Sequence, residues 1–146
     1  MTYVDTSTLL KLVVEEAGSD AAAVIWDSAD ALASVGLVVV EARAALAAAR
    51  RAGRLTEPQH REAKQEAATL IEELHLVEVT HELVIAAAEL AEAENLRGYD
   101  AVHLAGALLV GAEVCTSADD ALCEAASGRG LHIANPLGGP SQADSP

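Results

Sequence analysis

Residues 2–16 read TYVDTSTLLKLVVEE, and this stretch predicts a short strand that runs directly into a helix. Tyr3 and Val4 favour a strand, because aromatic and β-branched side chains pack well on a pleated surface. Asp5 follows them together with two hydroxyl residues, which are typical of turns and helix N-termini. Apolar side chains then recur at helical spacing, at Leu9, Leu10, Val13 and Val14. A buried strand that leads straight into a helix is a building unit of α/β folds.

The same alternation continues along the chain. Four more short apolar segments predict strands, at residues 31–35, 76–80, 113–117 and 131–135. Ala-rich or amphipathic segments predict helices between them, at residues 19–29, 38–53, 56–74, 81–95, 99–112 and 118–130. We therefore expect one α/β domain at residues 1–136, with a short, mostly parallel sheet of four to five strands and helices on both faces. Residues 137–146 are expected to form a flexible C-terminal tail.

The composition suits one domain of ordinary size. The chain has 146 residues, 51% of them hydrophobic and mostly Ala, Val and Leu, without any Phe. No apolar stretch approaches the roughly 18–20 residues of a membrane span, and the first residues do not resemble a signal peptide. A cytoplasmic location is therefore expected. In that compartment, Cys115 and Cys123 are expected to be free thiols that pack as small core residues.

The net charge of −14 argues against tight, autonomous binding of RNA. Nine Lys and Arg stand against 23 Asp and Glu, whereas nucleic-acid binders usually carry a basic surface. Of the few aromatic residues, Trp26 and Tyr99 are expected to pack within the fold. The side chains that could form a local basic patch are Lys11, Arg43, Arg50, Arg51, Arg54 and Arg97. For the group from Arg50 to Arg54, a solvated helix face is the better interpretation.

Four acidic residues are predicted to lie at one edge of the sheet. Asp5 ends the first strand, and Glu41 lies early in the helix that follows the second one. Asp100 is in the first turn of its helix, and Asp119 follows the strand at residues 113–117. Ligands of parallel sheets bind outside the carboxyl ends of the strands. Carboxylates that converge there repel one another unless a cation neutralises them, and one or two Mg²⁺ or Mn²⁺ ions are natural occupants.

Each acid also has a purely structural explanation. Asp5 stands where a helix cap is expected, and so does either Asp119 or its neighbour Asp120. Asp100 in a first turn favours the helix dipole. Glu41 is the least easily explained in this way, because it lies among apolar residues of a helix. The combination of the four acids, rather than any one of them, indicates a metal site.

The sequence resembles PIN-domain proteins, and among them the VapC-type toxins of bacterial toxin–antitoxin pairs. Four segments carry the resemblance, in the right order. They are YVDTSTLLKL at residues 3–12, VVVEARAAL at 38–46, LRGYDAVHLAGAL at 96–108 and TSADDALCEAASGRGLHIANP at 116–136. The third segment is the most distinctive.

This resemblance implies a Mg²⁺- or Mn²⁺-dependent endoribonuclease that is usually dimeric and is held inactive by a partner antitoxin. The metal-binding and catalytic carboxylates that it implies are Asp5, Glu41, Asp100 and Asp119. The last of these acts either on the metal directly or through water. The supporting hydroxyls are those of Ser7 and Ser117.

Other functions remain open on the sequence alone. A PIN nuclease of RNA processing would need no antitoxin, and a catalytically silent module would use the acidic pocket to bind a basic partner. A receiver-type phosphotransfer domain also places acids at strand ends, but it would need a Lys late in the chain, and none follows Lys64. His103, one helical turn beyond Asp100, is expected to have a packed or hydrogen-bonded structural role.

Overall fold

The computed structural model of the protein describes residues 1–138, whose centre is a five-stranded sheet. Its strands are β1 (Thr2–Val4), β2 (Leu32–Val35), β3 (His75–Val77), β4 (Val114–Thr116) and β5 (His132–Ala134). They lie in the order β3-β2-β1-β4-β5, and every neighbouring pair is parallel. In the central register, Tyr3 pairs with Ala33 on one side and with Cys115 on the other. The predicted α/β class and the parallel sheet are confirmed.

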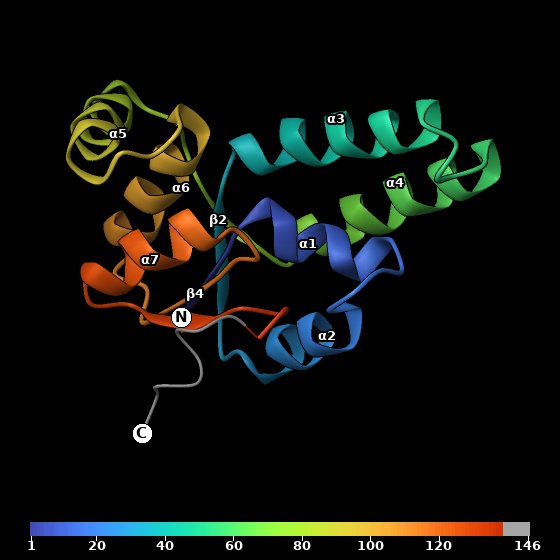
Figure 1. Ribbon diagram of the computed structural model, residues 1–146, viewed down its shortest axis with the longest axis horizontal. Coiled ribbons are helices and arrows are strands. Elements are labelled where there is room, and N and C mark those ends of the chain that lie inside the picture. Colours follow the sequence, from blue (N-terminus) through green and yellow to red (C-terminus); the bar gives the residue numbers. More distant parts are fainter. Residues whose placement is uncertain (139–146) are drawn as a thin grey trace.

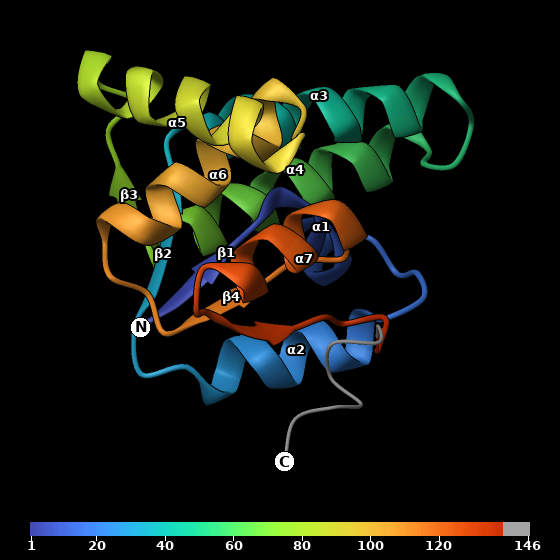
Figure 2. The same ribbon diagram turned by 60° about the vertical axis from the view of Figure 1, so that its left-hand side comes forward.

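Helices cover both faces of this sheet, as predicted (Figures 1 and 2). They are α1 (Thr6–Val13), α2 (Ser19–Ser28), α3 (Leu37–Arg51), α4 (Glu57–Glu72), α5 (His81–Glu94), α6 (Gly98–Leu109) and α7 (Asp120–Gly128). Helices α5, α6 and α7 pack on one face, and α1 to α4 lie on the other (Figure 1). The α3–α4 hairpin extends away from the sheet.

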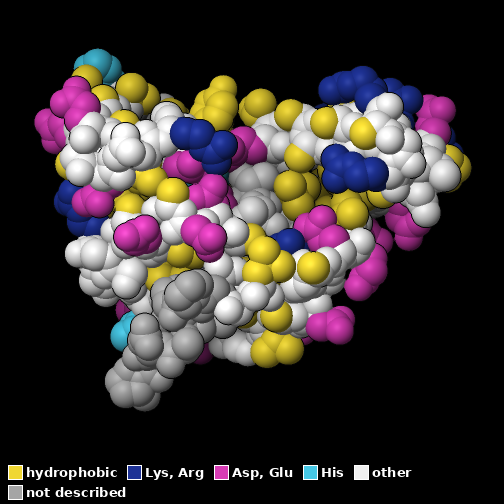
Figure 3. Space-filling model, viewed as in Figure 1, with side chains coloured by type: hydrophobic (Ala, Val, Ile, Leu, Met, Phe, Trp, Pro, Cys, Tyr) yellow, Lys and Arg dark blue, Asp and Glu magenta, His cyan; other side chains and the backbone are white. Residues whose placement is uncertain are grey.

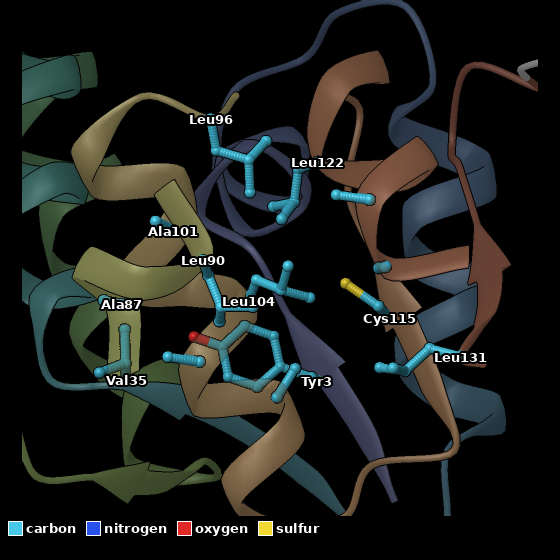
Figure 4. Packing of buried hydrophobic residues seen from close by; sticks show 14 of the residues in the cluster. Tyr3, Val35, Ala87, Leu90, Leu96, Ala101, Leu104, Cys115, Leu122 and Leu131 are labelled. Carbon is cyan, nitrogen blue, oxygen red and sulfur yellow. The ribbon is translucent and has the colours of Figure 1, made fainter. Parts of the chain in front are cut away.

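Neighbouring residues of β1 reach the two separate cores, because successive side chains of a strand point to opposite faces. Tyr3 packs with Leu104 of α6 and Leu122 of α7 (Figure 4). Val4 packs on the opposite face, and its core partners are Leu9, Trp26, Val38, Ala42 and Leu74. The central strand β1 is therefore fixed from both sides, and so is the turn that follows it.

Helix α6 lies close against β1 because position 106 is a glycine. A Cβ atom at Gly106 would lie 3.2 Å from Cε2 of Tyr3, which is tighter than an ordinary van der Waals contact. The Tyr3 ring fits under the helix there, and its hydroxyl reaches His103 one turn earlier. This close packing brings α6 to the edge of the sheet where the predicted acids lie.

The predicted strand at residues 76–80 is correct only in part. Strand β3 spans His75–Val77 and pairs with the three residues 33–35 of β2. Thr80 is instead the N-cap of α5, where its hydroxyl accepts a hydrogen bond from the Leu83 N–H at 3.1 Å. Alternating polarity fits a strand through residue 80, but the preference of Thr80 for a helix cap ends the extended segment earlier.

Both cysteines are free and buried, as predicted. Burial raises the pKa of the Cys123 thiol to about 11, and it raises the pKa of Cys115 still further. The two thiols therefore stay protonated at neutral pH and pack as small apolar groups. Within residues 1–138, no helix is long and apolar enough to cross a membrane. The predicted tail lies, from residue 139 onward, outside the described residues.

Candidate active site

The four predicted carboxylates lie where strands end and helices begin. Asp5 directly follows β1, and its backbone N–H donates to the Thr116 carbonyl of β4 at 3.0 Å. Glu41 lies in the second turn of α3, and Asp100 is the third residue of α6. Asp119 immediately precedes α7. These acids are linked in two pairs. His103 of α6 contacts Asp5 and Glu41, and Arg97, which precedes α6, contacts Asp100 and Asp119.

The Asp5 carboxylate is held by two serine hydroxyls. Ser7 donates to its Oδ2 atom at 2.7 Å, and Ser117 donates to the same oxygen at 2.8 Å. The side chain is only 8% exposed. Although Asp5 occupies the N-cap position of α1, its side chain makes no capping hydrogen bond. The helix-cap explanation therefore does not account for this carboxylate, and both predicted supporting hydroxyls contact it.

His103 of α6 connects Glu41 with Asp5. Its Nε2 atom lies 2.5 Å from Oε1 of Glu41 and 3.4 Å from Oδ1 of Asp5. On the other side of the ring, Nδ1 lies 2.8 Å from the Tyr3 hydroxyl. The Thr6 hydroxyl donates to the same Glu41 oxygen at 2.8 Å. His103 thus has the hydrogen-bonded role that was expected, and it also contacts two of the predicted site acids.

Burial and neighbouring charges shift the pKa values of His103 and Glu41 in opposite directions. Burial alone lowers the pKa of His103, but the hydrogen bond to Glu41 and the charges of Asp5 and Glu41 raise it above its ordinary value. Burial raises the pKa of Glu41, but the contacts with His103 and Thr6 bring it below its ordinary value. Both shifts favour an ionised Glu41 that accepts a hydrogen bond from Nε2 of the ring.

Arg97 connects the other two acids. Its Nε donates to Oδ2 of Asp100 at 3.0 Å, and its Nη2 donates to Oδ2 of Asp119 at 3.0 Å. The second oxygen of Asp119 accepts the Leu122 N–H at 3.0 Å, so Asp119, and not Asp120, caps α7. Burial raises the pKa of Asp100 and the charges of Asp119 and Asp5 add to this, although Arg97 opposes it. Asp100 therefore lies within electrostatic reach of both halves of the site.

A cavity opens beside these acids. It has a volume of about 790 Å³, and Glu41, Arg97 and Asp100 contribute to its wall together with small apolar residues of α5. Tyr99 also lines it and is 65% exposed, so the expectation that Tyr99 packs within the fold is wrong. The residue lies in the first turn of α6, at a position that faces away from the core. Trp26, by contrast, is buried as expected.

The candidate basic patch does not assemble around the site. Lys11 is buried and pairs with Glu16 at 3.0 Å. Arg50, Arg51 and Arg54 lie at the far end of the α3–α4 hairpin, where dark blue side chains gather in Figure 3. At 1.5 Å of rise per residue, the helix places Arg51 roughly 15 Å beyond Glu41. Arg43 is exposed on α3, and Arg97 is the member of the predicted patch that contacts the acids.

The sequence profile of the PIN domain matches residues 2–128. The chain belongs to the PIN-domain family. Ribonuclease VapC45 of Mycobacterium tuberculosis is 43% identical to it over 111 residues, which are 76% of this chain and 77% of that protein.

Two solved structures resemble this PIN domain in fold. VapC20 of Mycobacterium tuberculosis, described as a toxin that cleaves the sarcin–ricin loop, has a TM-score of 0.68 and 20% identity, over 90% of this chain and 96% of that one. The structure of FitAB bound to a DNA fragment has a TM-score of 0.72 and 13% identity, over 94% and 96% of the two chains.

The donor atoms of this PIN domain suit a hard divalent cation, because they are carboxylate oxygens with serine hydroxyls behind them. Among residues 1–138, however, no group of three or more His, Cys, Asp or Glu side chains is arranged so that it could hold a metal ion. In this arrangement His103 contacts Glu41, and Arg97 spans Asp100 and Asp119. The residues therefore fit a divalent metal ion by the chemistry of their donor atoms.

Proposed function

We propose that this PIN-domain protein is a metal-dependent endoribonuclease and the toxin of a VapBC-type toxin–antitoxin pair that acts in the cytoplasm. The observation that carries the proposal is the Asp5 carboxylate, which is buried at the carboxyl end of the central strand and held by two serines without capping its helix. The other three acids lie in the first two turns of α3, in the first turn of α6 and at the N-cap of α7. Its 43% identity to ribonuclease VapC45 supports the same activity.

In this proposal, the carboxylates that hold a Mg²⁺ or Mn²⁺ ion are Asp5, Glu41, Asp100 and Asp119. When bound, such an ion would supply positive charge that favours ionisation of a water molecule and offsets the negative charge of the scissile phosphate. Asp119 has one oxygen committed to the cap of α7, which favours a contact through water over direct ligation.

The chain's own residues supply the geometry of the reaction. Ser7 and Ser117 fix the orientation of Asp5, and His103 together with Thr6 holds Glu41 toward the same edge. RNA would reach the acids through the adjoining cavity, where the exposed ring of Tyr99 offers a face on which a base can stack. This local contact would compensate for a surface that repels RNA at long range.

The proposal predicts a strict requirement for a divalent ion. Purified protein, free of antitoxin, should cleave total RNA with Mg²⁺ or Mn²⁺ and should lose cleavage in excess chelator. Ca²⁺ should support little activity, because it binds with longer distances and looser geometry. The measurement is the appearance of discrete RNA fragments on a denaturing gel. Full cleavage in chelator would reject metal catalysis.

A neighbouring reading frame separates the related alternatives. A short antitoxin-like gene directly upstream would support the toxin, and co-expression with its product should suppress cleavage. RNA cleavage without any such partner would indicate a nuclease of RNA processing. A protein that binds the divalent ion but never cleaves RNA would indicate an interaction module.

We also propose a homodimer formed through α5 and α6. Apolar side chains of both helices are exposed, among them Ile85 of α5 at 48% and Leu109 of α6 at 66%. Leu109 lines a second cavity of about 720 Å³ together with Leu83, Ala86, Leu90 and Leu108. Exposed apolar area of this kind is commonly covered in a symmetric dimer.

A single charged substitution on the exposed apolar surface tests the proposed dimer. Leu109→Glu should convert the dimer to a monomer at micromolar concentration, because a carboxylate cannot be buried there without a partner. Light scattering measures the mass directly. Val24→Glu is the matched control, since Val24 is also exposed but lies on α2. A wild-type protein that is monomeric at these concentrations would remove the idea.

A further inference from the structure

Arg97 is placed differently from the other cations of the chain. Its guanidinium bridges carboxylates of two elements, the first turn of α6 and the cap of α7, with one nitrogen at 3.0 Å from each. Within residues 1–138, the other Lys and Arg ion pairs lie elsewhere, between Lys11 and Glu16 and between Arg129 and Glu94. A single positive group therefore offsets part of the negative charge of Asp100 and Asp119.

The hydrogen bonds of Arg97 have good geometry, but the exposed side chain can readily replace them by contacts with water. Planar guanidinium groups suit two carboxylates at once, because they carry five donors in a fixed fork. The Arg97 side chain is nevertheless 79% exposed, and exposed ion pairs contribute little net stability. It can leave the acids for solvent without opening the core. The two carboxylates themselves are far less exposed, at 13% and 26%, and remain in place.

We propose that Arg97 is a built-in counter-ion that competes with the divalent cation for Asp100 and Asp119. The inference rests on the proposed metal-dependent function and adds a form of regulation to that site. A divalent ion and the guanidinium would draw on the negative charge of the same two carboxylates, so binding of one would disfavour binding of the other. The apparent affinity for the metal ion would then be lowered, because only the molecules in which Arg97 has left the two carboxylates could bind it. The released guanidinium would remain on the wall of the cavity, beside Tyr99.

Binding of Mn²⁺ alone, measured by isothermal titration calorimetry without RNA, tests this directly. Arg97→Gln should bind Mn²⁺ roughly threefold to tenfold more tightly than the wild type, because the competing group and its charge are gone. Arg97→Lys should lie between the two, since an ammonium keeps the charge but cannot bridge both carboxylates in the same way. Arg43→Gln is the control, as it removes the same charge from an exposed position two residues from Glu41.

A crystal structure with and without Mn²⁺ gives a second readout. The guanidinium should move beyond hydrogen-bond distance of both Oδ2 atoms when the ion is bound. Unchanged or weaker Mn²⁺ binding by Arg97→Gln, or an equal gain in Arg43→Gln, would overturn the inference and leave the proposed function intact. A wild-type protein that binds no Mn²⁺ would instead count against the metal-dependent function itself.

Discussion

Asp5→Asn is expected to reduce RNA cleavage by several orders of magnitude while leaving the fold intact. The amide has the shape of the carboxylate, and its oxygen can still accept the hydrogen bonds that Ser7 and Ser117 donate. What it lacks is the negative charge that a divalent ion requires. Cleavage of a defined RNA at saturating Mn²⁺ measures the effect, and Mn²⁺ titration should show weakened binding in the same variant.

An exposed aspartate away from the candidate site provides a control for the change in net charge. Asp30→Asn makes the same chemical change at an exposed loop position and should cleave RNA at the wild-type rate. Asp100→Asn should behave like Asp5→Asn, because it removes a carboxylate from the same edge of the sheet. Wild-type cleavage by either site variant would mean that the acids are assigned wrongly.

Leu104→Ala is expected to lower the free energy of unfolding by about 2–5 kcal/mol, which is a large part of the stability of a small domain. Leu104 is fully buried between α6 and β1, in the core that contains Tyr3 and Cys115 (Figure 4). Truncation leaves a cavity, and the Ala-rich helices around it offer few long side chains to fill the space. Urea denaturation followed by circular dichroism gives the change.

Val40→Ala is the corresponding surface control, since this side chain on α3 is 65% exposed. It should change the free energy of unfolding by less than about 0.5 kcal/mol. If Leu104→Ala were as mild as this control, the packing of α6 against the sheet would not be a main source of stability. The position of His103, one residue before Leu104, depends on that packing.

Much of the architecture follows from local patterns in the chain. The order of strands and helices is encoded in apolar runs and in cap residues, such as Thr56, which forms a capping box with Gln59 at the start of α4. The alternation of the two element types is enough to imply a parallel sheet. The end of β3 was not predictable in this way, because a three-residue edge strand carries too little pattern to compete with the cap at Thr80.

The positions of the acids were also accessible from sequence, because each follows a strand or opens a helix, and those ends meet at one edge of a parallel sheet. The side chains that contact these acids could not be predicted from the sequence. His103 contacts Glu41 across 62 positions and Tyr3 across 100, and Arg97 reaches Asp119 across 22. Such contacts depend on how closely α6 approaches β1 and on which way long side chains turn.

The sequence by itself therefore determined the α/β framework and the family, and it predicted the set of carboxylates. Only the tertiary structure decided that these carboxylates are held in two pairs, one by a buried histidine and the other by an exposed arginine. The physical reason is that secondary structure arises from periodic, local preferences, whereas the pairing of charges is set by distances between residues that the fold alone brings together.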